Sequence, residues 1–258
     1  MTSWLTLEQS LGAPGLRIAP VRGGVPSPWS EFVRACFHVK HIPYSLVDAR
    51  DPDRGLTPLK PLTAQESLPV VFWNDERPRS YWLEQLLLAE RLSSQPRLLP
   101  EDPLERAKVV GLVAELCCES GLGWHRRVMM MGRLLSEPTF GDRERGIGRY
   151  LSKKYQHNTD SVEGSTRRCE AIVATFVDLR AAGHDYLLGS SLTALDLAWA
   201  AFAALIQPLP EDLCPMKPLW RDLYTWAPSG TPRHTVQALL AFRERIYRDW
   251  LVLPVDLG

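Results

Sequence analysis

Residues 16–47 read LRIAPVRGGVPSPWSEFVRACFHVKHIPYSLV, and they predict a strand, a helix and a second strand in succession. Residues 16–21 and 42–47 are apolar runs of strand length. Between them, the apolar residues recur with the spacing of one helical face at Trp29, Phe32, Val33, Cys36 and Phe37. Ser27 and Pro28 are typical of a helix start. So short a connection predicts a βαβ unit with parallel strands.

The next segment continues as a small α/β domain. Residues 51–67 form a Pro-rich loop, and residues 69–73 read as a third strand. Residues 77–79 have the length of a short fourth strand, and Ser80 is placed to cap the helix that follows. The order βαβ, loop, ββα is that of a thioredoxin-like domain.

The rest of the chain has a different pattern. Residues 93–103 contain several Pro and Ser residues among polar neighbours, which is typical of a linker. Beyond it, helical patterns occupy residues 104–135, 143–157, 167–182, 193–207 and 235–251. The first of these is long enough for one bent helix or two. We therefore expect a thioredoxin-like domain at 1–92, a linker at 93–103 and an all-helical domain at 104–258.

One of these helices is expected at the centre of the second domain. Residues 193–207 are almost wholly apolar, which predicts a buried helix. Thr193 and Asp196 have the spacing of a capping box, in which the acid reaches back to the backbone N–H of Thr193. Gly183 is placed to end the preceding helix.

Composition excludes several classes of protein. The 258 residues include 30 Lys plus Arg and 30 Asp plus Glu, so the net charge of zero argues against a protein that coats nucleic acid. There is no apolar run of about 18 residues and no basic segment before an apolar one, which predicts a cytoplasmic protein without a membrane partner. Five Cys without a CxxC motif and six His without ligand spacing predict reduced thiols and no zinc site.

Four motifs, in order along the chain, carry a family resemblance. They are Ser27-Pro28-Trp29-Ser30 with Arg34 and Lys40-His-Ile-Pro-Tyr44, then Leu68-Pro69, then Ser80, then Gly189-Ser-Ser-Leu-Thr193-Ala-Leu-Asp196. With the two-domain pattern, they resemble the cytosolic glutathione transferase family, in particular Ser-type, tau-like or omega-like members of bacterial style. The resemblance covers most of the chain. It implies an α/β thioredoxin-like domain plus an all-α domain, glutathione as co-substrate, and a homodimer.

Ser27 is the catalytic residue that the resemblance implies. A hydroxyl at this position donates a hydrogen bond to the thiol of glutathione, and the helix N-terminus adds positive potential. Both effects favour the thiolate, so the nucleophile is activated on glutathione and not on the protein. The alternative is that Ser27 only caps the helix. A Cys at position 27 would instead indicate thiol–disulfide exchange. Cys36, two helical turns further along the same helix, is expected in the core.

The resemblance also implies a set of glutathione-binding residues, namely Ser27, Trp29, Lys40, Leu68, Pro69, Arg79 and Ser80. The backbone of Leu68, before a cis proline, would pair with the cysteinyl backbone of glutathione. The hydroxyl of Ser80 and the N-terminus of its helix would hold the γ-glutamyl carboxylate.

The chain departs from the family pattern at two of these positions. Many members carry an acid at the position of Arg79, where it helps to hold the ammonium group of glutathione; a guanidinium binds a carboxylate instead. Several Ser-type members carry a Lys at the position of Ser67. Lys40 is then a candidate cation for glutathione, or a solvated surface residue.

The second substrate is expected to be a small hydrophobic electrophile bound by the helical domain. Trp124, Arg127 and Met131 are the candidate pocket residues, and the alternative is that Trp and Met at helical spacing belong to the core. The leading function is a glutathione-dependent transferase, isomerase or reductase. The alternatives are a non-catalytic ligand-binding or protein-interaction module, which Arg79 favours, and an oxidoreductase that uses Cys117 or Cys118.

Overall fold

The first half of the molecule is built on a four-stranded sheet. The computed structural model describes residues 4–155 and 161–257. The elements of this half are β1 (Leu5–Thr6), α1 (Leu7–Gly12), β2 (Leu16–Ala19), α2 (Pro28–His38), β3 (Tyr44–Asp48), η1 (Thr57–Leu59), α3 (Lys60–Thr63), β4 (Val70–Trp73) and α4 (Trp82–Leu92). The strand order is β1-β3-β2-β4, with β2 parallel to β3 and antiparallel to β4. The predicted βαβ unit is therefore confirmed.

Four local details of this half differ from the prediction, and the first is that residues 57–63 of the predicted Pro-rich loop form η1 and α3. Strand β1 and helix α1 were not predicted, and β1 adds to the sheet beside β3. In place of a fourth strand at 77–79, Arg79 forms a single bridge with Val71; Pro78 has no N–H with which to extend the pairing. Helix α4 begins one residue later than expected, because Tyr81 and not Ser80 is its N-cap residue.

The second half is helical. Its elements are α5 (Pro103–Cys117), α6 (Leu122–Ser136), α7 (Asp142–Lys154), α8 (Ser161–Ala181), α9 (Ala194–Phe202), η2 (Ala203–Leu205), α10 (Pro218–Tyr224) and α11 (Arg233–Trp250). Residues 104–135 thus form two helices and not one, and α10 was not predicted. Gly183 follows α8 with a φ of +78°, as its predicted role requires. The end of the helix predicted at 143–157 lies outside the described residues beyond Tyr155.

Helix α9 lies in the centre of the helical half. All of its residues are buried. The carboxylate of Asp196 accepts hydrogen bonds from the backbone N–H of Thr193 at 2.8 Å and of Leu187 at 2.9 Å. Burial raises the pKa of Asp196, an effect that these hydrogen bonds oppose. The predicted reach-back of the acid to Thr193 is confirmed.

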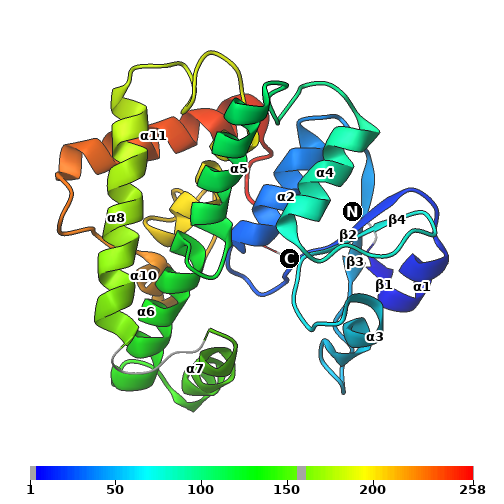
Figure 1. The fold of residues 1–258 in the computed structure, drawn as a ribbon. Coiled ribbons are helices and arrows are strands. Elements are labelled where there is room, and N and C mark those ends of the chain that lie inside the picture. Colours follow the sequence, from blue (N-terminus) through cyan, green and yellow to red (C-terminus); the bar gives the residue numbers. More distant parts are fainter. Residues whose placement is uncertain (1–3, 156–160, 258) are drawn as a thin grey trace.

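The two halves share one apolar core. In Figure 1, α2 and α4 lie between the strands and the helices of the second half. Helix α2 packs on α9, and buried residues of the sheet, α2, α5, α6, α9 and α11 belong to one continuous cluster. Residues 93–102 contain no helix or strand. Among the residues that the structure describes, no helix is both long and apolar enough to cross a bilayer.

Candidate functional site

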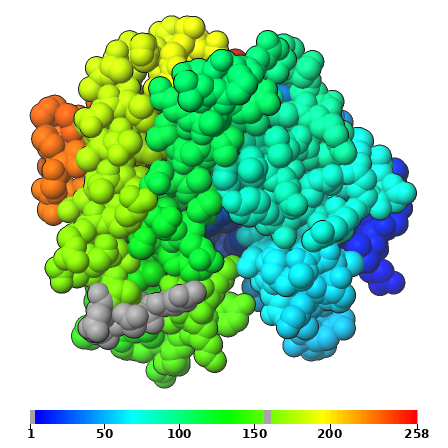
Figure 2. Space-filling model, viewed as in Figure 1, coloured from blue at the N-terminus to red at the C-terminus, as the bar shows by residue number. Residues whose placement is uncertain are grey.

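A cleft of about 820 Å³ opens between the two halves. Its walls come from three segments of the sheet half (20–29, 48–56 and 66–68) and from helices α6, α7 and α10. Figure 2 shows the hollow between the green surface of the helical half and the cyan surface of the sheet half. A cleft between two packed bodies is a common position for a ligand site.

Ser27 lies on the sheet wall of this cleft, at the N-cap position of α2. Its carbonyl oxygen begins the helix by accepting the N–H of Glu31 at 2.9 Å. Its hydroxyl makes no capping hydrogen bond and has no other partner among the described residues. Pro28 at the first helical position has no N–H to offer. The hydroxyl and the positive end of α2 are thus both available to an anion in the cleft.

The loop that carries Ser27 is tied down at three points. The backbone N–H of Val21 donates to the hydroxyl of Ser30 at 3.0 Å. The N–H groups of Gly23 and Gly24 donate to the carbonyl of Leu257 at 3.3 and 3.2 Å. The phenol of Tyr224 on α10 donates to the carbonyl of Pro26 at 3.0 Å. These ties fix the backbone on which Ser27 sits.

Leu68 lies on the same wall and offers its backbone. The Leu68–Pro69 peptide bond is cis. Neither the N–H nor the C=O of Leu68 is hydrogen bonded to any residue that the structure describes, whereas the carbonyl of the buried Pro69 accepts the side chain of Gln85 at 3.0 Å. A free donor and acceptor beside each other suit an extended peptide ligand.

Trp29 also lines the cleft, at the junction of the two halves. Its indole N–H donates to the carbonyl of Cys117 at 2.9 Å, and its ring packs edge-on against Phe202 at 5.1 Å between centroids. Gly123 on α6 faces both rings, and a Cβ there would stand 2.5 Å from Phe202 and 2.8 Å from Trp29. The Gly at 123 is therefore needed for close packing.

Of the three predicted pocket residues on α6, two line the cleft and one does not. Arg127 and Met131 are on its wall. Trp124 is not; its ring packs edge-on against Tyr155 at 4.9 Å between centroids. The prediction for Trp124 is corrected accordingly. Its position on α6 places it behind the lining residue Tyr155 instead of beside the ligand space.

Lys40 is placed away from the cleft, and the prediction that it binds glutathione is corrected. Its side chain is 0% exposed and pairs with Glu90 at 2.7 Å. Its ammonium also donates to the carbonyls of Ser93 and Pro96, each at 2.8 Å. It therefore fastens residues 93–102 to the sheet half and is neither a ligand cation nor a solvated one.

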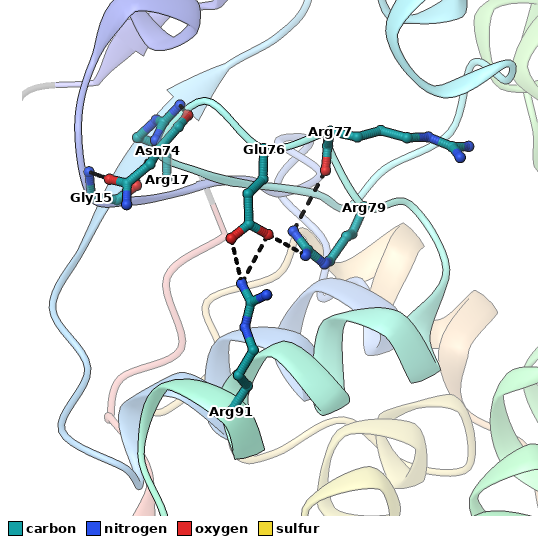
Figure 3. Close-up of polar contacts among 7 residues, drawn as sticks. All are labelled: Gly15, Arg17, Asn74, Glu76, Arg77, Arg79 and Arg91. Carbon is teal, nitrogen blue, oxygen red and sulfur yellow. Dashed lines mark hydrogen bonds and ion pairs between the residues drawn. The ribbon is translucent and has the colours of Figure 1, made fainter.

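Arg79 and Ser80 are also absent from the cleft lining. Figure 3 shows Arg79 beside Glu76, which it contacts at 2.5 Å and which Arg91 contacts at 2.7 Å. Hydrogen bonds from Arg91 and Arg79 lower the pKa of Glu76. Glu76 thus serves both Arg79 and Arg91, so this one carboxylate offsets only part of the positive charge that the sequence places against the ammonium of glutathione.

Several lining residues were not predicted, because the helix predicted at 143–157 was given no role in the site and α10 was not predicted. They are Tyr155 and Lys154 at the end of α7, Arg143 and Tyr150 on α7, and Trp220, Leu223 and Tyr224 on α10. The available signal was the aromatic cluster of Trp220, Tyr224 and Trp226, which the sequence places between the last two predicted helices.

The cysteines are separate from this site. All five are free thiols, and only Cys118 is not fully buried. Burial raises the pKa of Cys117 well above its ordinary value, so this thiol stays protonated and unreactive. Cys36 is buried in the core, as predicted, and burial raises its pKa also. In the described residues, no group of His, Cys, Asp or Glu side chains is arranged to hold a metal ion.

The architecture and the position of the cleft define the glutathione transferase fold, a small mixed α/β sheet followed by a largely helical remainder. A glutathione S-transferase domain-containing protein from Marinobacter aquaeolei VT8 has a TM-score of 0.62 and 18% identity over 90% of this chain and 97% of that chain. A glutathione S-transferase from Methylobacterium radiotolerans, solved with glutathione sulfonate, has a TM-score of 0.59 and 17% identity over 94% and 97%.

A third solved structure shows the breadth of this fold. The beta-etherase of Sphingobium sp. strain SYK-6 has a TM-score of 0.59 and 15% identity over 90% of this chain and 95% of that chain. No protein-family model and no curated protein matches the chain. At these identities the similarity establishes the fold, while the reaction has to be argued from the cleft.

Proposed function

We propose that this protein is a Ser-type, glutathione-dependent transferase. One observation carries the proposal: Ser27, whose hydroxyl has no partner among the described residues, stands at the N-terminus of α2 and lines the same cleft as Leu68, whose backbone N–H and C=O are unpaired there. Solved structures of the same fold contain glutathione or glutathione sulfonate. A hydroxyl donor and a helix N-terminus suit a thiolate, and a free N–H and C=O suit the peptide that carries it.

In the proposed reaction, Ser27 donates a hydrogen bond to the sulfur of glutathione. This bond and the dipole of α2 stabilise the thiolate relative to the thiol, and the thiol proton is released to solvent. The sulfur lone pair then forms a bond to an electrophilic carbon of the second substrate, and the bond to the leaving group or the π bond of that carbon breaks. Trp29 and Leu68 line the cleft and position glutathione, with the buried Pro69 outside the lining fixing the backbone of Leu68, and Met131 provides apolar surface for the electrophile.

The binding of the γ-glutamyl end is the least typical part of the proposed site. Ser80 stays the proposed partner of its carboxylate, and no acid stands at position 79 for its ammonium. Because Glu76 is shared by Arg79 and Arg91 and offsets only part of their charge, we expect the departure at this position to weaken the binding of glutathione. A cytoplasmic homodimer is proposed on the family resemblance, and sedimentation of the purified chain tests the dimer.

Titration with glutathione tests the proposal, with intrinsic tryptophan fluorescence as the readout because Trp29 and Trp220 line the cleft. We expect saturable binding and conjugation of an electrophilic aryl halide. The variant Ser27→Ala should still bind glutathione but lose roughly a hundredfold in conjugation, as when one donor to a developing anion is removed. Ser136→Ala, at the exposed end of α6, is the matched control and should have no effect.

Three outcomes would count against the proposal. Without any fluorescence change at millimolar glutathione, the chain would be a non-catalytic ligand-binding or interaction module. Full conjugation by Ser27→Ala would show that Ser27 is only part of the helix start. Loss of activity on alkylation of Cys118, the more exposed thiol of the vicinal pair, would favour the oxidoreductase alternative.

A further inference from the structure

The charge along the cleft is one-sided. The ionisable side chains on its walls, His and Tyr apart, are the cations Arg22, Arg50, Arg127, Arg143 and Lys154 and the acids Asp48 and Glu66. Arg22 and Asp48 form an ion pair with each other. The other four cations therefore share the cleft with one acid, Glu66. A cleft lined in this way concentrates anions.

Arg127 is held in this cleft without an acidic partner. One terminal guanidinium nitrogen donates to the phenol of Tyr224 at 2.9 Å, and the guanidinium lies 5.0 Å from the centre of the Tyr224 ring. Its other neighbours include the thioether of Met130 and the phenol of Tyr155. No carboxylate within the described residues 4–155 and 161–257 forms an ion pair with it. A half-buried guanidinium without an anion is costly, and an anionic ligand removes that cost.

The neighbouring residue, Arg126, has a purely structural role and serves as a comparison for Arg127. Arg126 is buried and donates to the carbonyl of Leu205 at 2.7 Å and to that of Tyr224 at 3.2 Å. It also lies over the ring of Trp226. Arg126 thus closes the ends of η2 and α10, whereas Arg127, one residue later on α6, faces the cleft and contacts no main-chain carbonyl of the described residues.

Lys154 brings a second cation to the same space from α7. Its ammonium donates to the hydroxyl of Ser67 on the opposite wall at 2.7 Å. Burial, and then the positive charge of Arg127, lower the pKa of Lys154. The positive charges of Arg127 and Lys154 on the helical wall therefore oppose each other, and an anion bound beside both relieves the repulsion.

The surface beside these cations is apolar. Helices α6, α7 and α10 contribute Met130, Met131, Leu134, Ile147, Leu151, Trp220 and Leu223 to the lining. A ligand for this wall combines an apolar body with one anionic group. The wall also lies close to the proposed reacting centre, because the Tyr224 phenol that holds Arg127 donates to the carbonyl of Pro26, the residue before Ser27.

We propose that the second substrate is an apolar carboxylic acid whose carboxylate is bound by Arg127, with Lys154 as the neighbouring cation. This rests on the proposed function, since it assigns the anion to the second substrate of that cleft. Glutathione also has carboxylates, but its proposed contacts are on the sheet wall at Ser27 and Leu68. Arg127 belongs to the helical wall, where Met131 and the other apolar residues lie.

The test compares two probes of the same shape, biphenyl-4-carboxylate and biphenyl-4-carboxamide, which differ in charge. Binding to the full chain is measured by calorimetry in the absence of glutathione. We expect the carboxylate to bind more tightly to the natural protein, and Arg127→Met to lose roughly ten- to hundredfold in carboxylate affinity, as for hydrogen bonds to a charged group. Binding of the carboxamide should be unchanged, which also shows that the variant is folded.

Two further variants keep the test specific. Arg127→Lys retains the charge without the planar fork, and should keep part of the preference for the carboxylate. Arg149→Met removes an exposed arginine of α7 that is outside the cleft lining, and should change neither affinity.

Three results would overturn the inference. The first is equal affinity of the natural protein for the two probes. The second is an Arg127→Met variant that keeps the preference for the carboxylate. The third is loss of glutathione affinity in Arg127→Met without loss of carboxylate affinity, which would assign Arg127 to glutathione. The proposed function fails separately: if glutathione does not bind but the carboxylate binds through Arg127, the anion site remains and the transferase proposal falls.

Discussion

The two walls of the cleft are built in different ways. On the sheet wall, Ser27 and Leu68 offer a ligand features of the main chain. Ser27 lies at a helix N-terminus, and Leu68 has an unpaired backbone N–H and C=O. On the helical wall, Arg127, Tyr224 and Lys154 act through long side chains from three separate helices. The sheet wall suits a constant ligand with a peptide backbone. Substitutions of side chains on the helical wall can change the ligand that it binds without any change of fold.

The largest effect on stability is expected at Lys40, a buried cation of the sheet half. Lys40→Met should lower the free energy of unfolding by about 3–5 kcal/mol, because the carboxylate of Glu90 and two carbonyls lose their partner. The affinity of the folded variant for glutathione should not change. Chemical denaturation and ligand titration check the two statements, with the exposed Lys108→Met as control. Weaker glutathione binding at unchanged stability would return Lys40 to the ligand site.

The packing where the two walls meet is tested at Gly123. Gly123→Ala should cost about 1–3 kcal/mol of stability, because its methyl group would overlap the rings of Trp29 and Phe202. Thermal unfolding measures the effect. Gly111→Ala on α5, where a Cβ meets nothing within 4 Å, is the matched control and should stabilise the protein by about 1 kcal/mol. Equal effects of the two substitutions would show that α6 does not approach α2 so closely.

The phenol of Tyr224 joins the two walls, and its removal tests whether this link orients Arg127. Tyr224→Phe removes the hydrogen bond that the phenol donates to the carbonyl of Pro26 and the one that it accepts from Arg127. We expect a loss of about 1 kcal/mol, or about fivefold, in affinity for biphenyl-4-carboxylate. Tyr186→Phe, far from the lining, is the control. An unchanged affinity would mean that Arg127 is oriented by the rest of its surroundings.

The smallest effect on binding is expected at Trp124. Trp124→Leu removes the ring contact with Tyr155, which should lower stability by about 1 kcal/mol while ligand affinity stays the same. Trp29→Leu, by contrast, removes a lining residue and should weaken the binding of glutathione. The same titration measures both variants. Loss of affinity in Trp124→Leu would place this ring in the pocket after all.

The positions of Ser27 and Leu68 on the sheet wall could be predicted from the sequence, because both residues are tied to local backbone features. A Ser-Pro pair before a helical pattern places Ser27 at the start of α2, and Leu68-Pro69 stands immediately before β4 whatever the rest of the molecule does. The capping box of Thr193 and Asp196 is local in the same sense. The order of helices and strands follows from such features with few errors.

The helical wall could not be predicted to the same depth. Whether Trp124 or Arg127 faces the cleft depends on the rotation of α6, which is fixed by contacts of Gly123 with Trp29 and Phe202. In the sheet half, the burial of Lys40 could not be predicted either, because lysine is usually a surface residue. Lys40 is buried because Glu90 and the carbonyls of Ser93 and Pro96 surround its ammonium group. These contacts join segments far apart in sequence, so a local pattern contains no record of them.

In the proposed function, Ser27 lowers the pKa of a thiol bound in the cleft, and this thiol can be titrated directly. The ultraviolet absorbance of the thiolate, followed against pH with glutathione bound to the natural protein and to Ser27→Ala, gives the pKa of the bound thiol in each. We expect the pKa of the bound thiol to lie below that of free glutathione in the natural protein and to be higher in Ser27→Ala. The same pKa in both proteins would contradict it.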